Sequence, residues 1–320
     1  MPRLSIVIPC VGGAAEFDGT LVSILQNRPA DCEVLVVHTE PYNDPYSLTG
    51  EVRFIEAEFN EAQESLVGLL NLAVEAAQGE VLHIVGCGLE VIENWTEAAL
   101  EHFCDQEVAA VSPAIVTADR QSLVAAGVYW SLGGVRCVVS DRRVIERGSG
   151  RLRSRIQGPT LAAAFYRRDV IAALGGFDAQ LGNQLADVSM ALDIQALGRL
   201  HVCEPASRLV DIGQRQNSLS SGFAAGRAAE RLFWRHAHQR GISASLAMHG
   251  CSVAAGAILE RPSQFLGSLA GRGLAWLEIG AAARQEQRLA AANERLKELA
   301  ELRATVRKVS APAKERRRAA

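Results

Sequence analysis

Short apolar runs rich in β-branched residues alternate with helical patterns through the N-terminal third of this chain, and this alternation restricts its fold more than any other feature. The runs are residues 4–8, 33–37, 52–55 and 81–85. Strands that are joined by helices run parallel, and the helices cover both faces of the sheet. Because the runs are almost continuously apolar, we expect burial on both sides. The sequence therefore predicts an α/β fold with a Rossmann-like, doubly wound, mostly parallel sheet.

Helical periodicity fills the gaps between these runs. Leu21, Ile24 and Leu25 follow Asp18, and residues 66–77 repeat apolar side chains three and four positions apart. Farther along, the pattern predicts strands at 111–116, 137–140 and 201–203, and helices at 161–174 and 187–197. From about residue 222 onward the chain is rich in alanine and has a helical pattern.

These patterns divide the chain into four parts. Residues 1–215 form the α/β domain, 216–283 a helical extension, 284–309 an amphipathic or coiled-coil helix, and 310–320 a basic, disordered tail. The stripe of Leu289, Leu296 and Leu299 is too short for an independent two-stranded coiled coil. We therefore expect this helix to pack against the protein's own helices from Ala224 onward, or to join them in a homodimer.

Charge and cysteine content exclude several classes of function. The chain has 33 Lys and Arg against 36 Asp and Glu, so its balance gives no reason to expect a nucleic-acid partner. Its seven cysteines form no C-x-x-C pair, which argues against a disulfide framework or a thiolate zinc site and favours a reducing compartment. Since we find neither a signal-peptide pattern nor a spanning apolar run, we predict a cytoplasmic protein, with peripheral contact at the inner face of the membrane left open.

Ligand-binding residues are expected just beyond the carboxyl ends of the parallel strands. Those segments begin at Pro9, His38 and Gly86. No G-x-G-x-x-G motif follows the first strand and no Walker loop occurs, which disfavours a dinucleotide enzyme or a phosphate-loop NTPase. Cys87 lacks a neighbouring His or Asp in the sequence, so a cysteine hydrolase is only a third hypothesis.

Several motifs, taken in order, resemble family 2 glycosyltransferases with the GT-A fold. They are residues 4–9 (LSIVIP), 20–25 (TLVSIL) and 33–37 (EVLVV), Asn60, residues 71–73 and 76–82, Asn94-Trp95 with Leu100, residues 175–178 (GGFD), Ala186-Asp187 and Gly198. The resemblance covers roughly residues 3–210. It implies that residues 1–215 form a GT-A-like glycosyltransferase domain whose substrate is a nucleotide sugar.

The chain departs from the family's pattern at two sites. After the fourth strand the family carries an Asp-x-Asp motif that holds Mg²⁺ or Mn²⁺ against the donor diphosphate, whereas this chain has Gly86-Cys87-Gly88. Glycine offers no side-chain ligand, and a thiol is a poor ligand for a hard cation. After the second strand the family carries paired Asp residues for the nucleotide base, and here the residues are His38-Thr39-Glu40. We therefore expect no divalent metal and no other cofactor.

The expected donor site combines strand-end residues with arginines. Its members are Pro9, His38, Glu40, Asn71, Gly86, Cys87, Gly88, Arg153 and Arg155. Arg142, Arg143 and Arg151 lie in the same basic segment. Guanidinium groups match phosphate oxygens in bidentate fashion, so these arginines can replace a metal in neutralising a diphosphate. An exposed basic hairpin is the alternative interpretation.

Asp187 is the expected catalytic residue. The resemblance implies that it is the base that takes a proton from the acceptor hydroxyl, although the family's Glu-Asp pair is reduced here to Ala186-Asp187. Asp is also a common helix N-cap, so a capping role stays open on the sequence alone.

Two hypotheses for function follow. In the first, the protein transfers a sugar from a nucleotide-sugar donor to a saccharide, lipid or protein hydroxyl, with inversion and without a metal. In the second, it is a catalytically inactive binding or scaffold protein that keeps the glycosyltransferase fold, since a fold does not determine its function.

Overall fold

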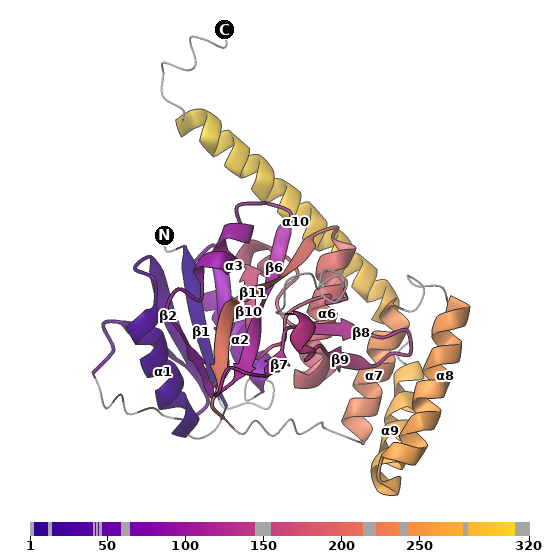
Figure 1. Ribbon diagram of the computed structural model, residues 1–320. Coiled ribbons are helices and arrows are strands. Elements are labelled where there is room, and N and C mark those ends of the chain that lie inside the picture. The colour runs from indigo at the N-terminus through magenta and orange to yellow at the C-terminus, as the bar shows by residue number, and fades with distance from the viewer. Residues whose placement is uncertain are drawn as a thin grey trace.

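The computed structural model describes residues 3–11, 15–40, 42, 44, 47–58, 65–144, 155–213, 222–236, 242–277 and 281–310. Its centre is one mixed sheet with the strand order β3-β2-β1-β4-β10-β6-β11-β5, and β7 pairs with β6 (Figure 1). The strands are β1 (Leu4–Cys10), β2 (Cys32–His38), β3 (Val52–Glu56), β4 (Val81–Val85), β5 (Leu89–Val91), β6 (Val108–Thr117), β7 (Leu123–Ala125), β10 (Ala163–Arg167) and β11 (Leu200–Asp211).

The N-terminal half of the sheet has the predicted architecture. Strands β3, β2, β1 and β4 are parallel. Alternate residues of each strand face opposite sides: Val7 and Leu82 contact the core beneath α2 (Leu66–Ala76), whereas Ile6 and Ile8 contact the core beneath α1 (Ala15–Asn27). Helix α3 (Glu97–His102) lies on the α1 side, and α5 (Arg168–Ala173) and α6 (Gly182–Ala196) lie on the α2 side. Both faces are covered, as expected for a doubly wound sheet.

The prediction of a helix at residues 161–174 is wrong in its first half. Residues 163–167 form β10, which runs antiparallel between β4 and β6, and the helix α5 begins only at Arg168. The Phe165 ring stacks on the His83 ring with centroids 3.6 Å apart. A short apolar run does not distinguish a buried strand from a buried helix by periodicity alone, and here pairing on both edges determines the strand.

Two further segments differ in length from the predictions. Strand β11 covers residues 200–211, well beyond the predicted 201–203, and it pairs with β6 in parallel and with β5 antiparallel. Helix α6 begins at Gly182 rather than at Asp187, after the 3-10 helix η2 (Ala179–Leu181), whose N-cap is Asp178. Two short strands, β8 (Val128–Trp130) and β9 (Arg136–Val138), form a separate hairpin before the 3-10 helix η1 (Arg142–Val144).

Three helices form the part of the extension that the structure describes. They are α7 (Phe223–His236), α8 (Ile242–Leu259) and α9 (Pro262–Trp276), and α8 and α9 project from one end of the molecule (Figure 1). Helices α7 and α9 pack closely because Gly226 and Gly271 stand at their contact: a Cβ on Gly271 would come within 2.0 Å of the Phe223 carbonyl oxygen. Among the described residues, no helix combines the length and apolarity needed to cross a bilayer.

One buried carboxylate ties these three helices together. Glu230 on α7 accepts hydrogen bonds from the indole Nε1 of Trp234 (2.8 Å) and of Trp276 (2.9 Å), from Arg272 on α9 (2.8 Å), and from His249 Nε2 on α8 (3.0 Å). Burial alone would raise the pKa of Glu230, but these hydrogen bonds lower it to about 2. The other ring nitrogen of His249 donates to the Gly133 carbonyl at 3.1 Å, which links the extension to the β8–β9 turn.

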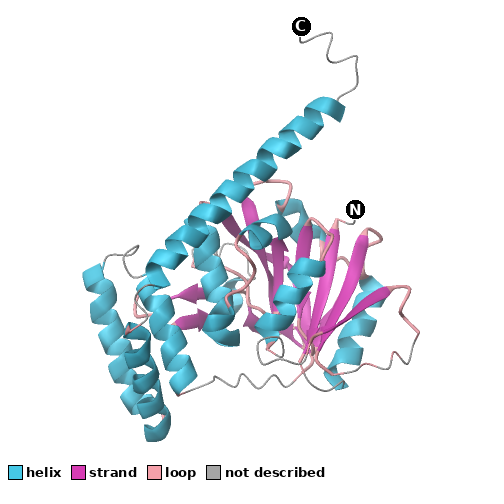
Figure 2. Ribbon diagram, turned by 180° about the vertical axis from the view of Figure 1, so that it is seen from behind, coloured by secondary structure: helices cyan, strands magenta, loops and turns pink. Residues whose placement is uncertain are grey.

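The last helix, α10 (Ala281–Ser310), packs on the α/β domain rather than chiefly on the preceding helices (Figure 2). Ala292 and Leu296 are buried in the core beneath α2, α5 and α6. Arg288 donates to the Leu174 and Gly176 carbonyls, and Arg303 pairs with Asp169 at 2.7 Å. The predicted partners from Ala224 onward are therefore secondary, because α5 takes most of the apolar stripe. Residues 311–320 of the expected tail lie outside the described part of the chain.

Replacing a buried leucine of α10 tests this attachment. Leu296 is 7% exposed, whereas Leu302 on the same helix is 62% exposed. We expect Leu296→Ala to lower the free energy of unfolding by about 2–3 kcal/mol, because it leaves a cavity beneath the helix. The matched control Leu302→Ala should change it by less than about 0.5 kcal/mol. Urea denaturation measures both, and equal effects would show that α10 does not pack as described.

Candidate active site

The ends of three parallel strands bring most of the expected donor residues to one edge of the sheet. Pro9 lies at the end of β1, His38 at the end of β2, and Gly86 directly after β4. Since these strands are neighbours in the order β2-β1-β4, the segments after them lie side by side, as the doubly wound topology predicts.

The loop 86–88 is held by hydrogen bonds to three other parts of the chain. Gly86 N donates to the Ala162 carbonyl (2.8 Å), and Gly88 N donates to the Thr20 hydroxyl (3.0 Å). The Gly88 carbonyl accepts from Ile212 N at 3.0 Å. Gly88 has a φ of +82°, a conformation that favours glycine. Where family 2 glycosyltransferases carry the metal motif, this chain has a backbone turn, residues 86–88, that is held in place by these hydrogen bonds.

The segment after β2 has an aromatic wall rather than paired carboxylates. His38 Nδ1 donates to the Glu40 carbonyl at 2.8 Å. The Tyr42 ring stacks on Phe54, with centroids 5.2 Å apart, and meets the edge of Phe17 at 5.0 Å. This half-buried tyrosine stands at the edge where the resemblance places the nucleotide base. The sequence prediction missed Tyr42, because a lone aromatic in a loop has no distinctive spacing.

Asp187 is buried in the interior of α6 and bonded to an arginine from the β8–β9 hairpin. Its carboxylate accepts from Arg136 Nε (3.0 and 3.1 Å to the two oxygens) and from Arg136 NH2 (2.6 Å). The backbone amides of Val188 and Leu161 also donate to it. The helix starts five residues earlier, at Gly182, so the N-cap interpretation of Asp187 is wrong.

Burial dominates the electrostatics of Asp187. Its side chain is 1% exposed, and desolvation raises the pKa of the carboxyl above its usual value even though Arg136 and the two amides lower it. The Arg136 side chain is 24% exposed, so it can be reached from solvent while Asp187 cannot. The sequence prediction missed Arg136. In the sequence it is only a basic residue shortly after Gly133-Gly134, and nothing there relates it to Asp187.

Two consecutive residues connect Asp187 with the loop 86–88. Leu161 N donates to the Asp187 carboxylate, and the Ala162 carbonyl accepts from Gly86 N. Asp187 and Gly86 are therefore separated by one short stretch of main chain, although they are about a hundred positions apart in the sequence. The structure brings together the two parts of the site that the resemblance assigns to donor and base.

A cavity of about 690 Å³ lies between the β8–β9 hairpin and the C-terminal half of α6. It is lined by the hairpin residues Tyr129 and Trp130, and by Ala191 and Ile194 of α6, which lie one and two helical turns beyond Asp187. Trp130 is paired with Arg136 in the hairpin, but Arg136, Asp187 and loop 86–88 do not line the cavity. Arg155 also lines it, with its guanidinium 5.2 Å from the Tyr129 ring centre.

Two expected donor residues lie elsewhere or outside the described residues. The Asn71 amide is bonded to the main chain of Phe177, donating to its carbonyl (2.9 Å) and accepting from its N–H (2.7 Å), which joins α2 to the turn before η2. Arg151 and Arg153 lie outside the described residues, and Arg143 pairs with Asp141 at 2.5 Å.

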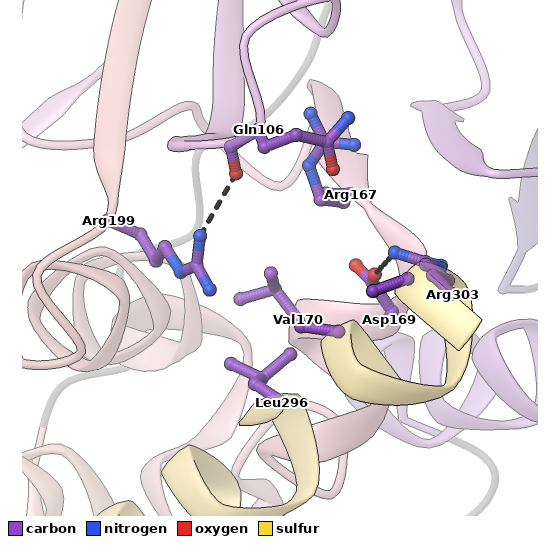
Figure 3. Close-up of a pocket in the computed structure, with 9 residues that line it drawn as sticks. Gln106, Arg167, Asp169, Val170, Arg199, Leu296 and Arg303 are labelled. Carbon is purple, nitrogen blue, oxygen red and sulfur yellow. Dashed lines mark hydrogen bonds and ion pairs between the residues drawn. The ribbon is translucent and has the colours of Figure 1, made fainter. Parts of the chain in front are cut away.

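A second cavity, of about 360 Å³, lies beneath α10 (Figure 3). Three arginines line it, and each bonds to oxygens of the protein. Arg199 donates to the Gln106 carbonyl at 3.0 Å, and Arg303 pairs with Asp169. The third, Arg167, donates to the Val108, Phe103 and Asp105 carbonyls. Because it is lined by none of the expected donor residues, we assign it no part in the site.

Comparison with known proteins gives weak sequence matches. No family model matches the chain. Polypeptide N-acetylgalactosaminyltransferase 12 of Mus musculus is 28% identical over 184 residues, and the protein of the same name from Homo sapiens is 28% identical over 198 residues. These matches take in 52% and 56% of this chain but 31% and 34% of those proteins, so the chain spans about a third of the length of the curated relatives it matches.

Structural comparison is clearer about the fold. The mannosyltransferase PcManGT from Pyrobaculum calidifontis, in complex with GDP-Man and Mn²⁺, has a TM-score of 0.52 at 18% identity, over 91% of this chain and 86% of that one. GalNAc-T7 with UDP, GalNAc and Mn²⁺ has a TM-score of 0.54 at 13% identity, over 82% of this chain and 58% of that one. The mixed, curled sheet with its covering helices therefore has the GT-A glycosyltransferase fold.

Both similar structures contain Mn²⁺, and the residues described here do not fit that ion. Loop 86–88 supplies a thiol and no carboxylate. Across the described parts of the chain, no group of three or more His, Cys, Asp or Glu side chains is placed to hold a metal. Since Mn²⁺ prefers carboxylate, carbonyl and water oxygens, we derive no step that passes through a metal.

The buried ion pair makes a prediction about stability and pH. Arg136→Gln would leave the Asp187 carboxylate without its cation, and we expect a loss of about 3 kcal/mol at neutral pH. Without Arg136 the pKa of Asp187 in the folded state rises further above that in the unfolded chain, so the variant should regain stability as the pH falls toward 5.

Thermal unfolding at pH 7.5 and at pH 5 measures this effect. The double variant Arg136→Gln with Asp187→Asn is the control, because it removes the charge as well as its partner and should recover most of the lost stability. A loss that is the same at both pH values would contradict the assigned ion pair.

Proposed function

We propose that this protein transfers a sugar from a nucleotide-sugar donor, bound at loop 86–88, to a hydroxyl acceptor. One observation carries the proposal: Leu161 and Ala162 bond Asp187 and Gly86 respectively, so the candidate base adjoins the candidate donor loop. The GT-A fold and the nucleotide sugars named for the similar structures support it.

In the proposed mechanism Asp187 is the general base. It takes the proton of the acceptor hydroxyl as the acceptor oxygen attacks the anomeric carbon from the face opposite the departing nucleoside diphosphate, which inverts that centre. The raised pKa of Asp187 suits a base, because proton transfer is efficient when the pKa lies nearer to working pH. In the structure its oxygens are already bonded to Arg136, so binding of substrate has to displace that arginine.

Arg136 is the residue that we propose in place of the metal. Its guanidinium is partly exposed and is bonded to the Asp187 carboxylate. A diphosphate offers it the same bidentate geometry as a carboxylate. Exchange of Arg136 from Asp187 to the donor diphosphate would neutralise the leaving group and release the base in one movement. This assignment replaces Arg153 and Arg155 of the sequence prediction as the principal cation.

Metal independence follows from this assignment and is tested by binding. We expect UDP- or GDP-sugars, titrated calorimetrically, to bind with a Kd that changes less than about twofold between 1 mM EDTA and Mn²⁺. Arg136→Gln should weaken that binding at least tenfold, whereas Lys297→Gln, on the exposed side of α10, should leave it unchanged. Binding that requires Mn²⁺ and disappears in EDTA would overturn the metal-free proposal.

The role of Asp187 as base is tested by turnover. Asp187→Asn preserves the size of the side chain but cannot accept a proton, so we expect kcat to fall by roughly a hundredfold or more while donor binding persists. Asp193 is a matched control, since it is equally buried on α6 but bonds to Gln285 and Arg288 of α10. Asp193→Asn should leave kcat within about twofold. Equal kcat for wild type and Asp187→Asn would refute the assignment.

The same measurements distinguish the second hypothesis. An inactive binding protein of this fold would bind nucleotide or sugar without turnover, and Asp187→Asn would then leave that binding unchanged.

The exposed apolar surface of α8 and α9 is the contact that we propose for a membrane surface or for a second copy of the chain. Its members with the largest exposure are Ile258, Leu259, Leu266 and Leu277.

A further inference from the structure

Two cysteine side chains meet at the edge of the expected donor site. Cys10 is the last residue of β1, and Cys87 is the middle residue of the loop after β4. Their thiols share a hydrogen bond, and Cys87 Sγ also lies 3.5 Å from the Pro9 carbonyl oxygen. The proposed transfer reaction uses neither sulfur.

The register of the sheet accounts for this meeting. Strands β1 and β4 pair in parallel, with Leu4 opposite Val81 and Val7 opposite Ile84. Cys10 and Cys87 lie three residues beyond the last of these pairs, at the end of β1 and in the turn after β4. Both side chains pack against the core beneath α1. Because the two thiols are in hydrogen-bond contact and Cys87 Sγ touches the residue before Cys10, the side chains are within reach of a disulfide, whose Cβ atoms lie about 3.5–4.5 Å apart.

The environment of the pair favours reaction with a small oxidant. Both cysteines are half-buried, so a small molecule can reach them. The hydrogen bond from Cys87 holds the pKa of the Cys10 thiol below its usual value, although burial and the nearby Glu40 and Asp18 carboxylates oppose this. The thiolate is the reactive form of cysteine, so Cys10 is the expected nucleophile.

We propose that Cys10 and Cys87 are a redox modification site that forms a reversible disulfide with small disulfides of the oxidised glutathione class. The Cys10 thiolate attacks one sulfur of the small disulfide, which forms a mixed disulfide and releases one small thiolate. Cys87 then loses its proton to solvent and attacks the Cys10 sulfur, which releases the second small thiolate. The protein loses two electrons, and the small disulfide is reduced to two thiols.

The bond would restrain the loop that holds the donor. It joins the middle of loop 86–88 to the end of β1, next to Pro9. That loop already has fixed ends, at Gly86 and at Gly88, so a covalent tie at Cys87 removes its remaining freedom to accommodate a ligand. This consequence rests on the proposed function, whereas formation of the bond does not. We expect donor binding at least tenfold weaker in the oxidised protein, and restored by reduction.

Mass spectrometry of the full chain tests the bond directly. The protein is equilibrated in mixtures of reduced and oxidised glutathione, trapped by acid and alkylation, and cut with trypsin and Glu-C. These proteases place Cys10 in peptide 4–16, Cys87 in peptide 81–90 and Cys104 in peptide 102–107. We expect 4–16 linked to 81–90 as the main cross-linked product, lost on treatment with dithiothreitol.

Single variants provide the controls. Cys10→Ser and Cys87→Ser should each abolish the linked product and leave the remaining cysteine as a mixed disulfide with glutathione. Cys104→Ser, which changes an exposed cysteine, should leave the product unaltered. Absence of the 4–16/81–90 product in fully oxidised glutathione would overturn the proposal.

Donor binding by the reduced and oxidised protein separates this proposal from the proposed function. A linked product without any change in donor affinity would refute the restraint of the loop. Failure of the reduced protein to bind any nucleotide sugar would instead count against the proposed function, and the mass measurement would still decide whether the bond forms.

Discussion

The site and the sheet both depend on one antiparallel strand, β10, buried between β4 and β6. It joins the parallel N-terminal half of the sheet to the C-terminal half, and its Phe165 stacks on the buried His83. Burial lowers the pKa of His83 to about 3, so this ring is neutral and accepts the Trp95 indole hydrogen bond at 2.9 Å. The residues just before β10 hold Gly86 and Asp187, so the packing that places this strand also sets the separation of the two parts of the site.

The Arg136–Asp187 ion pair keeps the Asp187 carboxylate of the candidate site away from solvent. A carboxylate that has lost its hydration needs compensating hydrogen bonds, and here an arginine and two backbone amides supply them. The same contacts occupy the oxygens that would take the proton in the proposed mechanism. A ligand that competes for Arg136 can therefore change the protonation behaviour of Asp187 without touching it, because removing a nearby cation raises the pKa of a buried acid.

The sequence predicted the first four strands and α2 well. Continuous β-branched runs indicate strands that are buried on both faces, and apolar residues three and four positions apart indicate the buried face of a helix. It failed at residues 163–167, where Ala-Ala-Phe-Tyr has no strict period and the strand exists only through its two neighbours. Of the candidate site, the sequence predicted only the residues at the carboxyl ends of strands, such as Pro9, His38 and Gly86. Arg136 and Tyr42 were not predicted, because only contacts between distant parts of the chain single them out. Arg136 bonds to Asp187, and Tyr42 stacks on Phe54. Asn71 was placed in the site, yet its amide serves the Phe177 main chain.

The contact of His249 with the Gly133 carbonyl joins the helical extension to the candidate site. Gly133 lies in the turn of the hairpin that carries Arg136, and Glu230 fixes His249 from the other side. Coupling between two binding sites is reciprocal. If movement of Arg136 shifts the turn, it changes the free energy of the His249 contact. A partner bound to α7, α8 or α9 then changes the free energy of that Arg136 movement by the same amount. The extension is thus more than a surface appended to the GT-A fold: a partner bound there would change the affinity of the hairpin for any ligand that moves Arg136.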